Sequence, residues 1–214
     1  MQKILAFTIA ILLTSVVAFA GDYPKVETFL GFTYMRANSA TNVPAFSSNG
    51  GSGQVAVNFN KWAGFVMDMG ATHNGNIGNN HLDSTFVNYL FGPRVSIRRS
   101  RLIPYFNILF GGVYAGNSIA VSATPIASTQ PVYPPGFPVP PANAPVTLRA
   151  VASQTAFGMT TGGGLDIKIN KWATFRPIGL DYFLTRFQNY RSANDNNQNN
   201  IRYTTGINFT FGAQ

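Results

Sequence analysis

Residues 199–211, with the sequence NNIRYTTGINFTF, decide the fold of this chain. Their side chains alternate strictly between two kinds. One face carries mainly β-branched and aromatic residues, namely Ile201, Tyr203, Thr205, Ile207, Phe209 and Phe211. The other face carries small and polar residues, namely Arg202, Thr204, Gly206, Asn208 and Thr210. This period-2 alternation predicts a β-strand with one apolar face.

Such a strand fits two kinds of protein. A soluble sandwich would bury the apolar face, whereas a transmembrane barrel would turn that face to lipid and the polar face to its lumen. The pattern Thr204-x-Gly206-x-x-Phe209-x-Phe211 resembles the C-terminal assembly signal of bacterial outer-membrane barrels, although three further residues, 212–214, follow it here. The resemblance implies the barrel assembly machinery as a partner. It also predicts an even number of strands upstream.

The composition is that of a single β-domain. The chain has 214 residues, of which 10% are charged and 14% aromatic, and it contains 21 glycines. It has no cysteine, which excludes a disulfide framework and a cysteine-based metal site. The net charge of +8 raises nucleic acid as a partner, but the basic residues form no stripe and no binding motif. We therefore expect no nucleic-acid binding.

The N-terminus has the layout of a secretory signal peptide. Residues 1–3 (MQK) carry a positive charge, residues 4–17 are apolar, and Ala18-Phe19-Ala20 has the small-x-small form that signal peptidase cuts after. The apolar run is shorter than the ~20 residues that a helix needs to span a bilayer. We expect residues 1–20 to be a cleaved signal peptide and residues 21–214 to form the barrel domain.

Segments of about ten residues alternate in the same way along the whole chain. The predicted strands are residues 25–36, 53–60, 62–72, 85–97, 102–114, 155–169, 172–186 and 199–211. The predicted connections are short at 60–61, 98–101 and 170–171, and long at 37–52, 73–84, 115–154 and 187–199. This alternation of lengths predicts an all-β fold, an eight-stranded antiparallel up-and-down transmembrane β-barrel with short periplasmic turns, long extracellular loops and both termini in the periplasm.

Three phrases carry a closer resemblance: Phe91-Gly92-Pro93-Arg94, the stretch GGGLD at 162–166, and Arg176-Pro177-Ile178 followed by Asp181-Tyr182. With them, residues 21–214 resemble the small OmpA/OmpX-type outer-membrane barrels, a compact barrel domain without a C-terminal peptidoglycan-binding domain. The resemblance implies the bacterial outer membrane, with its lipids and lipopolysaccharide as contacts. It implies little about activity, because one fold serves many functions. We expect a monomer.

Two short turns share a sequence. Residues 60–65 read NKWAGF and residues 170–175 read NKWATF, so Trp62 and Trp172 are expected at the same edge of the membrane, in an aromatic girdle. Other basic residues also fall in the short turns, namely Lys61, Arg98, Arg99, Arg101 and Lys171. We interpret these five as solvated turn charges.

The inward parity predicts charges inside the barrel. The expected lumen network consists of Glu27, Asp68, Arg94, Asp166, Lys168, Arg176 and Arg202. An eight-stranded barrel is just wide enough for side chains to fill it, and unpaired buried charges are costly, so these groups should pair and plug the lumen. The alternative is a narrow channel for ions or small solutes. Arg176 and Asp181 have opposite parity, so both face the lumen only if the strand bulges near Pro177 and Gly179.

The long loops carry the remaining candidates. The proline-rich segment 124–145, which contains PVYPPGFPVPPANAP, favours polyproline II and is either a recognition arm for a protein partner or a disordered loop without one. Four arginines could pair with lipopolysaccharide phosphates, namely Arg36, Arg149, Arg186 and Arg191.

The loop at 73–84 holds His73, His81 and Asp83, which nothing in the sequence brings together as metal ligands or as a catalytic group. We expect no metal, no cofactor and no enzymatic activity. An outer-membrane lipid-modifying enzyme and a soluble lipocalin-type carrier remain as minor alternatives. The expected role is structural or surface-interactive.

Overall fold

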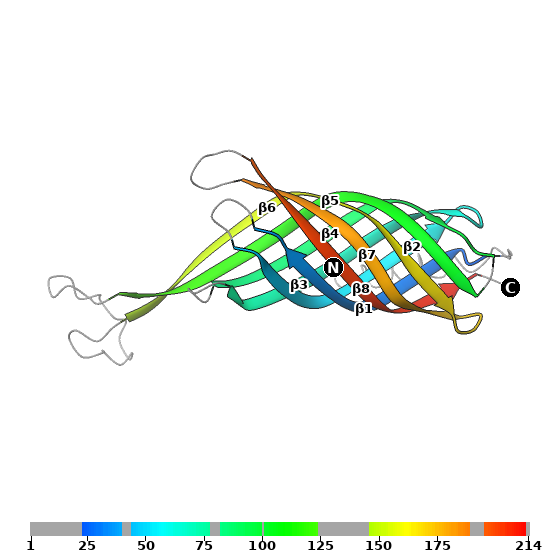
Figure 1. Ribbon diagram of the computed structural model, residues 1–214, viewed down its shortest axis with the longest axis horizontal. Coiled ribbons are helices and arrows are strands. Elements are labelled where there is room, and N and C mark those ends of the chain that lie inside the picture. Colours follow the sequence, from blue (N-terminus) through cyan, green and yellow to red (C-terminus); the bar gives the residue numbers. More distant parts are fainter. Residues whose placement is uncertain are drawn as a thin grey trace, which may run out of the picture.

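The described residues form one closed β-barrel (Figure 1). The computed structural model describes residues 23–39, 44–77, 82–99, 101–123, 146–188 and 195–212. Its strands are β1 (Val26–Ala37), β2 (Phe46–Asn58), β3 (Ala63–Ile77), β4 (Leu82–Ser96), β5 (Leu102–Ala123), β6 (Val146–Lys168), β7 (Ala173–Gln188) and β8 (Asp195–Phe211). Each strand pairs antiparallel with its neighbours in the sequence, and β8 closes against β1. The predicted fold class is confirmed.

Inward and outward side chains alternate as the sequence predicts. On β8, Arg202 and Thr204 are each 1% exposed and face the interior, whereas Ile201 is 54% exposed and Phe209 is 42% exposed. The other strands follow this pattern, with large apolar side chains on the outer surface and many polar ones inside. This is the reverse of a water-soluble protein and the arrangement of a membrane-spanning barrel. Within the described residues, no helix has the length and apolar character to cross a membrane.

The strands extend further toward the long-loop end than predicted. β2 starts at Phe46 rather than at residue 53, and β5 and β6 stay paired as far as Ala123 and Val146. Hydrophobic alternation indicates which face contacts lipid, and it disappears where both faces meet water. The backbone ladder does not need that alternation, so the strands continue and the loops predicted at 37–52, 73–84, 115–154 and 187–199 are too long.

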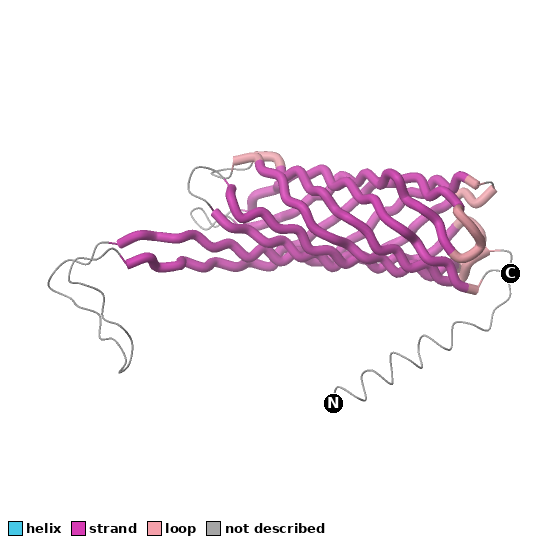
Figure 2. Tube along the Cα trace, turned by 90° about the horizontal axis from the view of Figure 1, so that it is seen from below, coloured by secondary structure: helices cyan, strands magenta, loops and turns pink. Residues whose placement is uncertain are grey.

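β5 and β6 project beyond the rest of the barrel as a two-stranded ribbon (Figure 2). Among the described residues, β4 pairs with β5 only as far as Ser118, and β7 pairs with β6 only from Phe157 onward. Beyond these points, toward the long loops, β5 and β6 pair only with each other among the described residues. Leu148 and Val151 of this ribbon are 58% and 73% exposed.

β7 contains the predicted bulge. Arg176 pairs with Gly206 of β8, but Gly179 pairs with Thr204, so β7 has one residue more than its partner between these points. The same region of β7 is out of step with β6. The bulge lies around Pro177, which has no N–H to give to a ladder. It allows Arg176 and Asp181 to face the lumen together, at 0% and 5% exposure.

Some predicted features lie outside the described residues. These are the signal peptide at 1–20, the proline-rich segment 124–145, His81 and Arg191.

Candidate functional site

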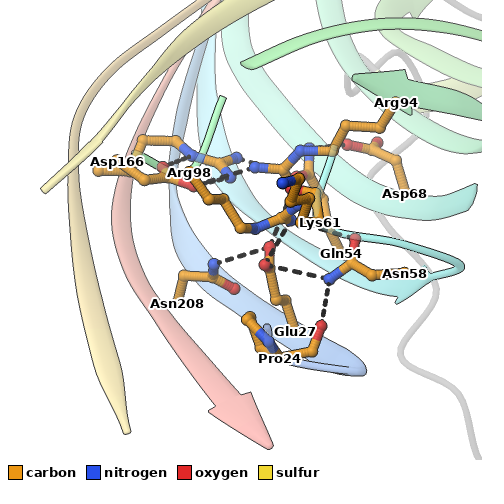
Figure 3. Close-up of polar contacts among 11 residues, drawn as sticks. Pro24, Glu27, Gln54, Asn58, Lys61, Asp68, Arg94, Arg98, Asp166 and Asn208 are labelled. Atoms are coloured by element: carbon orange, nitrogen blue, oxygen red, sulfur yellow. Dashed lines mark hydrogen bonds and ion pairs between the residues drawn. The ribbon is translucent and has the colours of Figure 1, made fainter. Parts of the chain in front are cut away.

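The lumen near the short turns contains a network centred on Glu27 of β1 (Figure 3). Its carboxylate lies 2.7 Å from Nη2 of Arg98 and 3.6 Å from Nη1 of Arg94. Asn58 donates a hydrogen bond to Glu27 Oε1 at 3.2 Å, and Asn208 donates one to Oε2 at 3.4 Å. These partners come from β2, β4, β8 and the turn after β4, so one carboxylate links several strands of the barrel.

A second carboxylate, Asp166 of β6, bridges two arginines. Its Oδ2 lies 3.0 Å from Nη2 of Arg94, and its Oδ1 lies 2.7 Å from Nε of Arg176. Because Arg94 also contacts Glu27, the two carboxylates belong to one continuous network. All four groups are at most 4% exposed, so the pairs are shielded from water.

The ring of Tyr105 contacts two guanidinium groups of this network, those of Arg94 and Arg176. The centroid of the ring lies 4.1 Å from Cζ of Arg94 and 4.3 Å from Cζ of Arg176. Both distances are in the range of cation–π attraction. Two glycines leave room for this side chain, because a Cβ on Gly164 or Gly179 would lie 2.7 or 2.8 Å from Tyr105 Oη. Glycine at positions 164 and 179 therefore makes room for the Tyr105 ring in the lumen.

A further group of ion pairs lies closer to the long loops. Nη1 of Arg202 is 2.9 Å from Oδ1 of Asp68, and its Nη2 is 2.8 Å from Oδ2 of Asp181. Asn88 donates to Asp68 Oδ1 at 2.6 Å. Gln54 donates to Asp68 Oδ2 at 2.7 Å.

Gln54 connects the two groups of ion pairs. Its amide nitrogen donates to Asp68, while its amide oxygen accepts a hydrogen bond of 2.9 Å from Nη1 of Arg176. In the described lumen, four arginines therefore face four carboxylates: Arg94, Arg98, Arg176 and Arg202 with Glu27, Asp68, Asp166 and Asp181. The network is electrically balanced.

Apolar side chains form two clusters in the interior. One buried cluster consists of Met35, Ala56, Val66, Leu90, Leu109, Val113 and Phe183. Toward the long loops a second cluster consists of Ala37, Phe46 and Ile77, with Leu82 and Phe86 against it. The rings of Phe46 and Phe86 stack with centroids 5.6 Å apart, and the Phe187 ring meets Phe86 edge-on at 6.3 Å. Sequence parity alone does not show how these inward apolar groups cluster.

Six of the seven predicted network residues lie inside the barrel, namely Glu27, Asp68, Arg94, Asp166, Arg176 and Arg202. Lys168 is the exception, and its assignment to the network is wrong. It is the last residue of β6, so its side chain is exposed at the rim although it shares the inward parity. Arg98, interpreted as a solvated turn charge, instead turns into the lumen and pairs with Glu27.

The sequence contains signals for the residues that were missed. Arg98 continues the inward parity of Arg94 and Ser96, which could have identified it. Placing Asp181 in the lumen from the sequence would have required the position of the bulge as well as the parity of the strand. Phe29 was also missed, although it shares the inward parity of Glu27 and Thr33. It is 1% exposed, and its ring centroid lies 4.2 Å from Cζ of Arg176.

Several buried polar atoms have no hydrogen-bond partner among the residues that the structure describes. Two are Nε of Arg94 and Oδ1 of Asn107, which are directly opposite each other on β4 and β5. Two more are Oγ1 of Thr174 and Oδ1 of Asn208, which are opposite each other on β7 and β8. Internal water usually satisfies such groups in proteins.

The predicted surface residues are exposed, except Gly206. Trp62 and Trp172 are 55% and 57% exposed beside the short turns. In the region resembling an assembly signal, Phe209 and Phe211 are 42% and 47% exposed, while Gly206 packs closely against backbone atoms of β1.

His73 and Asp83 contact each other across β3 and β4. His73 Nδ1 lies 3.5 Å from Asp83 Oδ1, and Asp83 Oδ2 lies 2.7 Å from Nη2 of Arg149. Their assignment to a loop is wrong, because both strands extend past the predicted ends. No group of three or more histidine, cysteine, aspartate or glutamate side chains suited to a metal occurs in the described part of the chain.

Comparison with known proteins gives the class of this fold. No protein-family model matches the chain, and no curated protein matches it. Among solved structures, Neisserial surface protein A (NspA) has a TM-score of 0.57 at 10% identity, over 87% of this chain and 97% of that chain. Ail, the attachment invasion locus protein of Yersinia pestis, has a TM-score of 0.52 at 13% identity, over 87% and 99%. The outer membrane protein OprG from Pseudomonas aeruginosa has a TM-score of 0.52 at 11% identity, over 90% and 98%.

At these identities the likeness shows the fold alone. The chain has the fold of the small eight-stranded outer-membrane β-barrels.

Proposed function

We propose that this protein is a bacterial outer-membrane barrel with a closed lumen, and that its role is structural and surface-interactive. The outer surface supports a membrane location, because large apolar side chains cover it while charged groups lie inside. The fold, shared with known outer-membrane barrels, supports the same location.

The charged network buried in the lumen is the observation that carries the proposal. Four arginines and four carboxylates neutralise one another inside the barrel, and Gln54 joins their two groups. On the long-loop side, the rings of Phe46, Phe86 and Phe187 pack together. An ion crossing the barrel would have to break a balanced ionic network and pass an apolar cluster, so the lumen acts as a plug.

The surface role rests on the β5–β6 ribbon. Residues 147–152 of β6 have no β7 partner among the described residues, so their outer backbone edge is open. An open edge with exposed Leu148 and Val151 is suited to pairing with an extended segment of another protein. The proline-rich segment 124–145 joins the two strands of this ribbon and is a further candidate for partner binding. We assign no catalytic role to His73 or His81.

A narrow channel is the second candidate. The unpartnered atoms of Arg94 and Asn107 favour it, because such groups mark places where water commonly enters a lumen. The aromatic cluster on the long-loop side argues against a continuous path.

Single-channel conductance separates the two functions. The purified barrel is inserted into a planar bilayer, and its folding is verified by the shift of its gel band on heating. A closed lumen gives no discrete current steps from the inserted protein. As a matched control for handling, a variant of the outer face, Phe91→Ala, should be equally silent. Reproducible steps from the unmodified protein would exclude the plug and establish the channel.

A further inference from the structure

The rim at the short-turn end of the barrel has an unbalanced positive charge. Six cationic side chains surround it, namely Lys25, Lys61, Arg99, Arg101, Lys168 and Lys171. All except Lys25 are exposed. Within the described part of the chain, no carboxylate lies at ion-pair distance from any of the six. The carboxylates whose side chains are described lie in the lumen or, for Asp83, toward the long loops.

Two turns of this rim are built in the same way. Each reads Asn-Lys-Trp-Ala, at residues 60–63 and 170–173. In both, the Asn side-chain oxygen accepts hydrogen bonds of 2.7–2.9 Å from the backbone N–H groups of the Trp and the Ala. The turn conformation is thereby fixed, and each turn presents one lysine directly before one tryptophan.

The tryptophans mark the level of a membrane interface. Trp62 and Trp172 are each more than half exposed, and they lie in turns that lead into β3 and β7, whose outer faces begin with Phe65 and Phe175. Nζ of Lys171 lies 5.8 Å from the centroid of the Trp172 ring, so the cation is beside the indole. An indole at the boundary between apolar tails and water, with a cation next to it, is matched to a lipid that carries a phosphate at that depth.

We propose that the short-turn rim binds anionic phospholipid headgroups, with Lys61 and Lys171 contacting their phosphates and Trp62 and Trp172 lying beside the acyl-chain boundary. This inference rests on the proposed membrane location. Charge complementarity selects an anionic lipid over a zwitterionic one, because six unpaired cations gain little from a headgroup of zero net charge. The half-exposed indoles select a lipid over a soluble polyanion, which would not reach an apolar surface.

The fluorescence of Trp62 and Trp172 tests this proposal, because the chain contains only these two tryptophans. The purified, folded protein is placed in vesicles of phosphatidylcholine and phosphatidylglycerol, with bromine atoms on the acyl chains of either one lipid or the other. Brominated lipid quenches the fluorescence of an indole that it contacts. Brominated phosphatidylglycerol should quench more strongly than brominated phosphatidylcholine at equal mole fraction, and salt should reduce the difference.

Matched variants test the residues. Replacing both lysines, Lys61→Gln with Lys171→Gln, should reduce the preference for phosphatidylglycerol by up to about fivefold for each lysine removed. The control pair, Thr147→Glu with Asn197→Glu, lowers the net charge by the same amount at exposed positions toward the long-loop end and should leave the preference unchanged. Equal loss in both pairs would show that net charge, and not this rim, selects the lipid.

Three other results have defined meanings. Equal quenching by the two brominated lipids in a folded, inserted barrel would overturn the inference and leave the proposed location intact. Failure of the protein to insert into any bilayer would overturn both. Displacement of phosphatidylglycerol by a soluble polyanion such as polyglutamate, at equal charge concentration, would assign the rim to an acidic macromolecule instead of a lipid.

Discussion

The two ends of the lumen are lined by different groups. Near the short turns, Glu27 and Asp166 share three arginines, so each carboxylate has more than one cationic partner. Further toward the long loops, Arg202 alone forms ion pairs with both Asp68 and Asp181, and apolar clusters surround and follow this group. Near the short turns, each carboxylate therefore keeps a cationic partner when Arg94 is lost, whereas both carboxylates of the second group depend on Arg202. Substitutions should therefore have unequal costs at the two ends.

Loss of Arg202 should have the largest effect. Arg202→Ala leaves Asp68 and Asp181 buried without a cationic partner, and an uncompensated buried charge costs about 3–5 kcal/mol of unfolding free energy. Urea unfolding of the barrel in lipid vesicles, followed by tryptophan fluorescence, measures the change. Arg36→Ala, which removes an exposed arginine, should change the unfolding free energy by less than about 0.5 kcal/mol. Similar midpoints for the two variants would show that the Arg202 pairs do not stabilise the barrel.

Truncation of Leu90 tests the apolar part of the same region. Leu90 is 0% exposed, so Leu90→Ala should lower the unfolding free energy by about 3 kcal/mol through lost burial and the remaining cavity. The outward-facing Leu180, which is 48% exposed, provides the control. If Leu180→Ala costs as much as Leu90→Ala in vesicles, packing inside the barrel contributes no more to stability than contact with lipid outside.

Loss of Arg94 should cost less than loss of Arg202, although both are buried. After Arg94→Ala, Glu27 keeps Arg98 and Asp166 keeps Arg176, so neither carboxylate is left alone. We expect a decrease of about 2 kcal/mol, the size of lost hydrogen bonds to a charged group. The urea midpoints of the two arginine variants, measured side by side, test the redundancy. A larger decrease for Arg94→Ala than for Arg202→Ala would reverse the comparison.

The sequence predicted the fold well because alternation is a local property. Every strand was placed from its own residues, and the bulge of β7 followed from a conflict of parity between Arg176 and Asp181. The strand ends toward the long loops were not predicted, because backbone pairing there continues without an apolar face. Inside the lumen, parity identified six charged residues, but it could not show how far a side chain reaches. Arg98 reaches inward from beyond the end of a strand, whereas Lys168 stays at the rim.

Connections within the lumen were also beyond sequence reasoning. Arg176 and Gln54 are 122 positions apart in the chain, and their contact depends on the closure of the barrel. The contact of Tyr105 with two guanidinium groups depends in addition on the space left by Gly164 and Gly179. Such contacts follow from the register and curvature of all eight strands together.

Substitution of Gln54 should have the smallest effect on stability, but it tests most directly how the two ends of the lumen are connected. Gln54 is the hydrogen-bonded link between the two groups of ion pairs. Gln54→Ala should lower the unfolding free energy by about 1–3 kcal/mol, since buried partners on Asp68 and Arg176 lose a hydrogen bond. A double-mutant cycle is more informative than this loss. The effects of Arg94→Ala and Arg202→Ala should be coupled by at least about 0.5 kcal/mol when Gln54 is present.

Without Gln54 the two arginine sites should become additive, because the remaining contacts of Asp166 and Asp68 do not join the two groups of ion pairs. The control cycle uses Gln198, which is equally buried but donates to the backbone of Asn38 rather than to either network. Gln198→Ala should leave the coupling between the arginines unchanged. If coupling persists without Gln54, the connection runs through packing of the apolar groups, and the two ends of the lumen form one structural unit rather than two joined by a single amide.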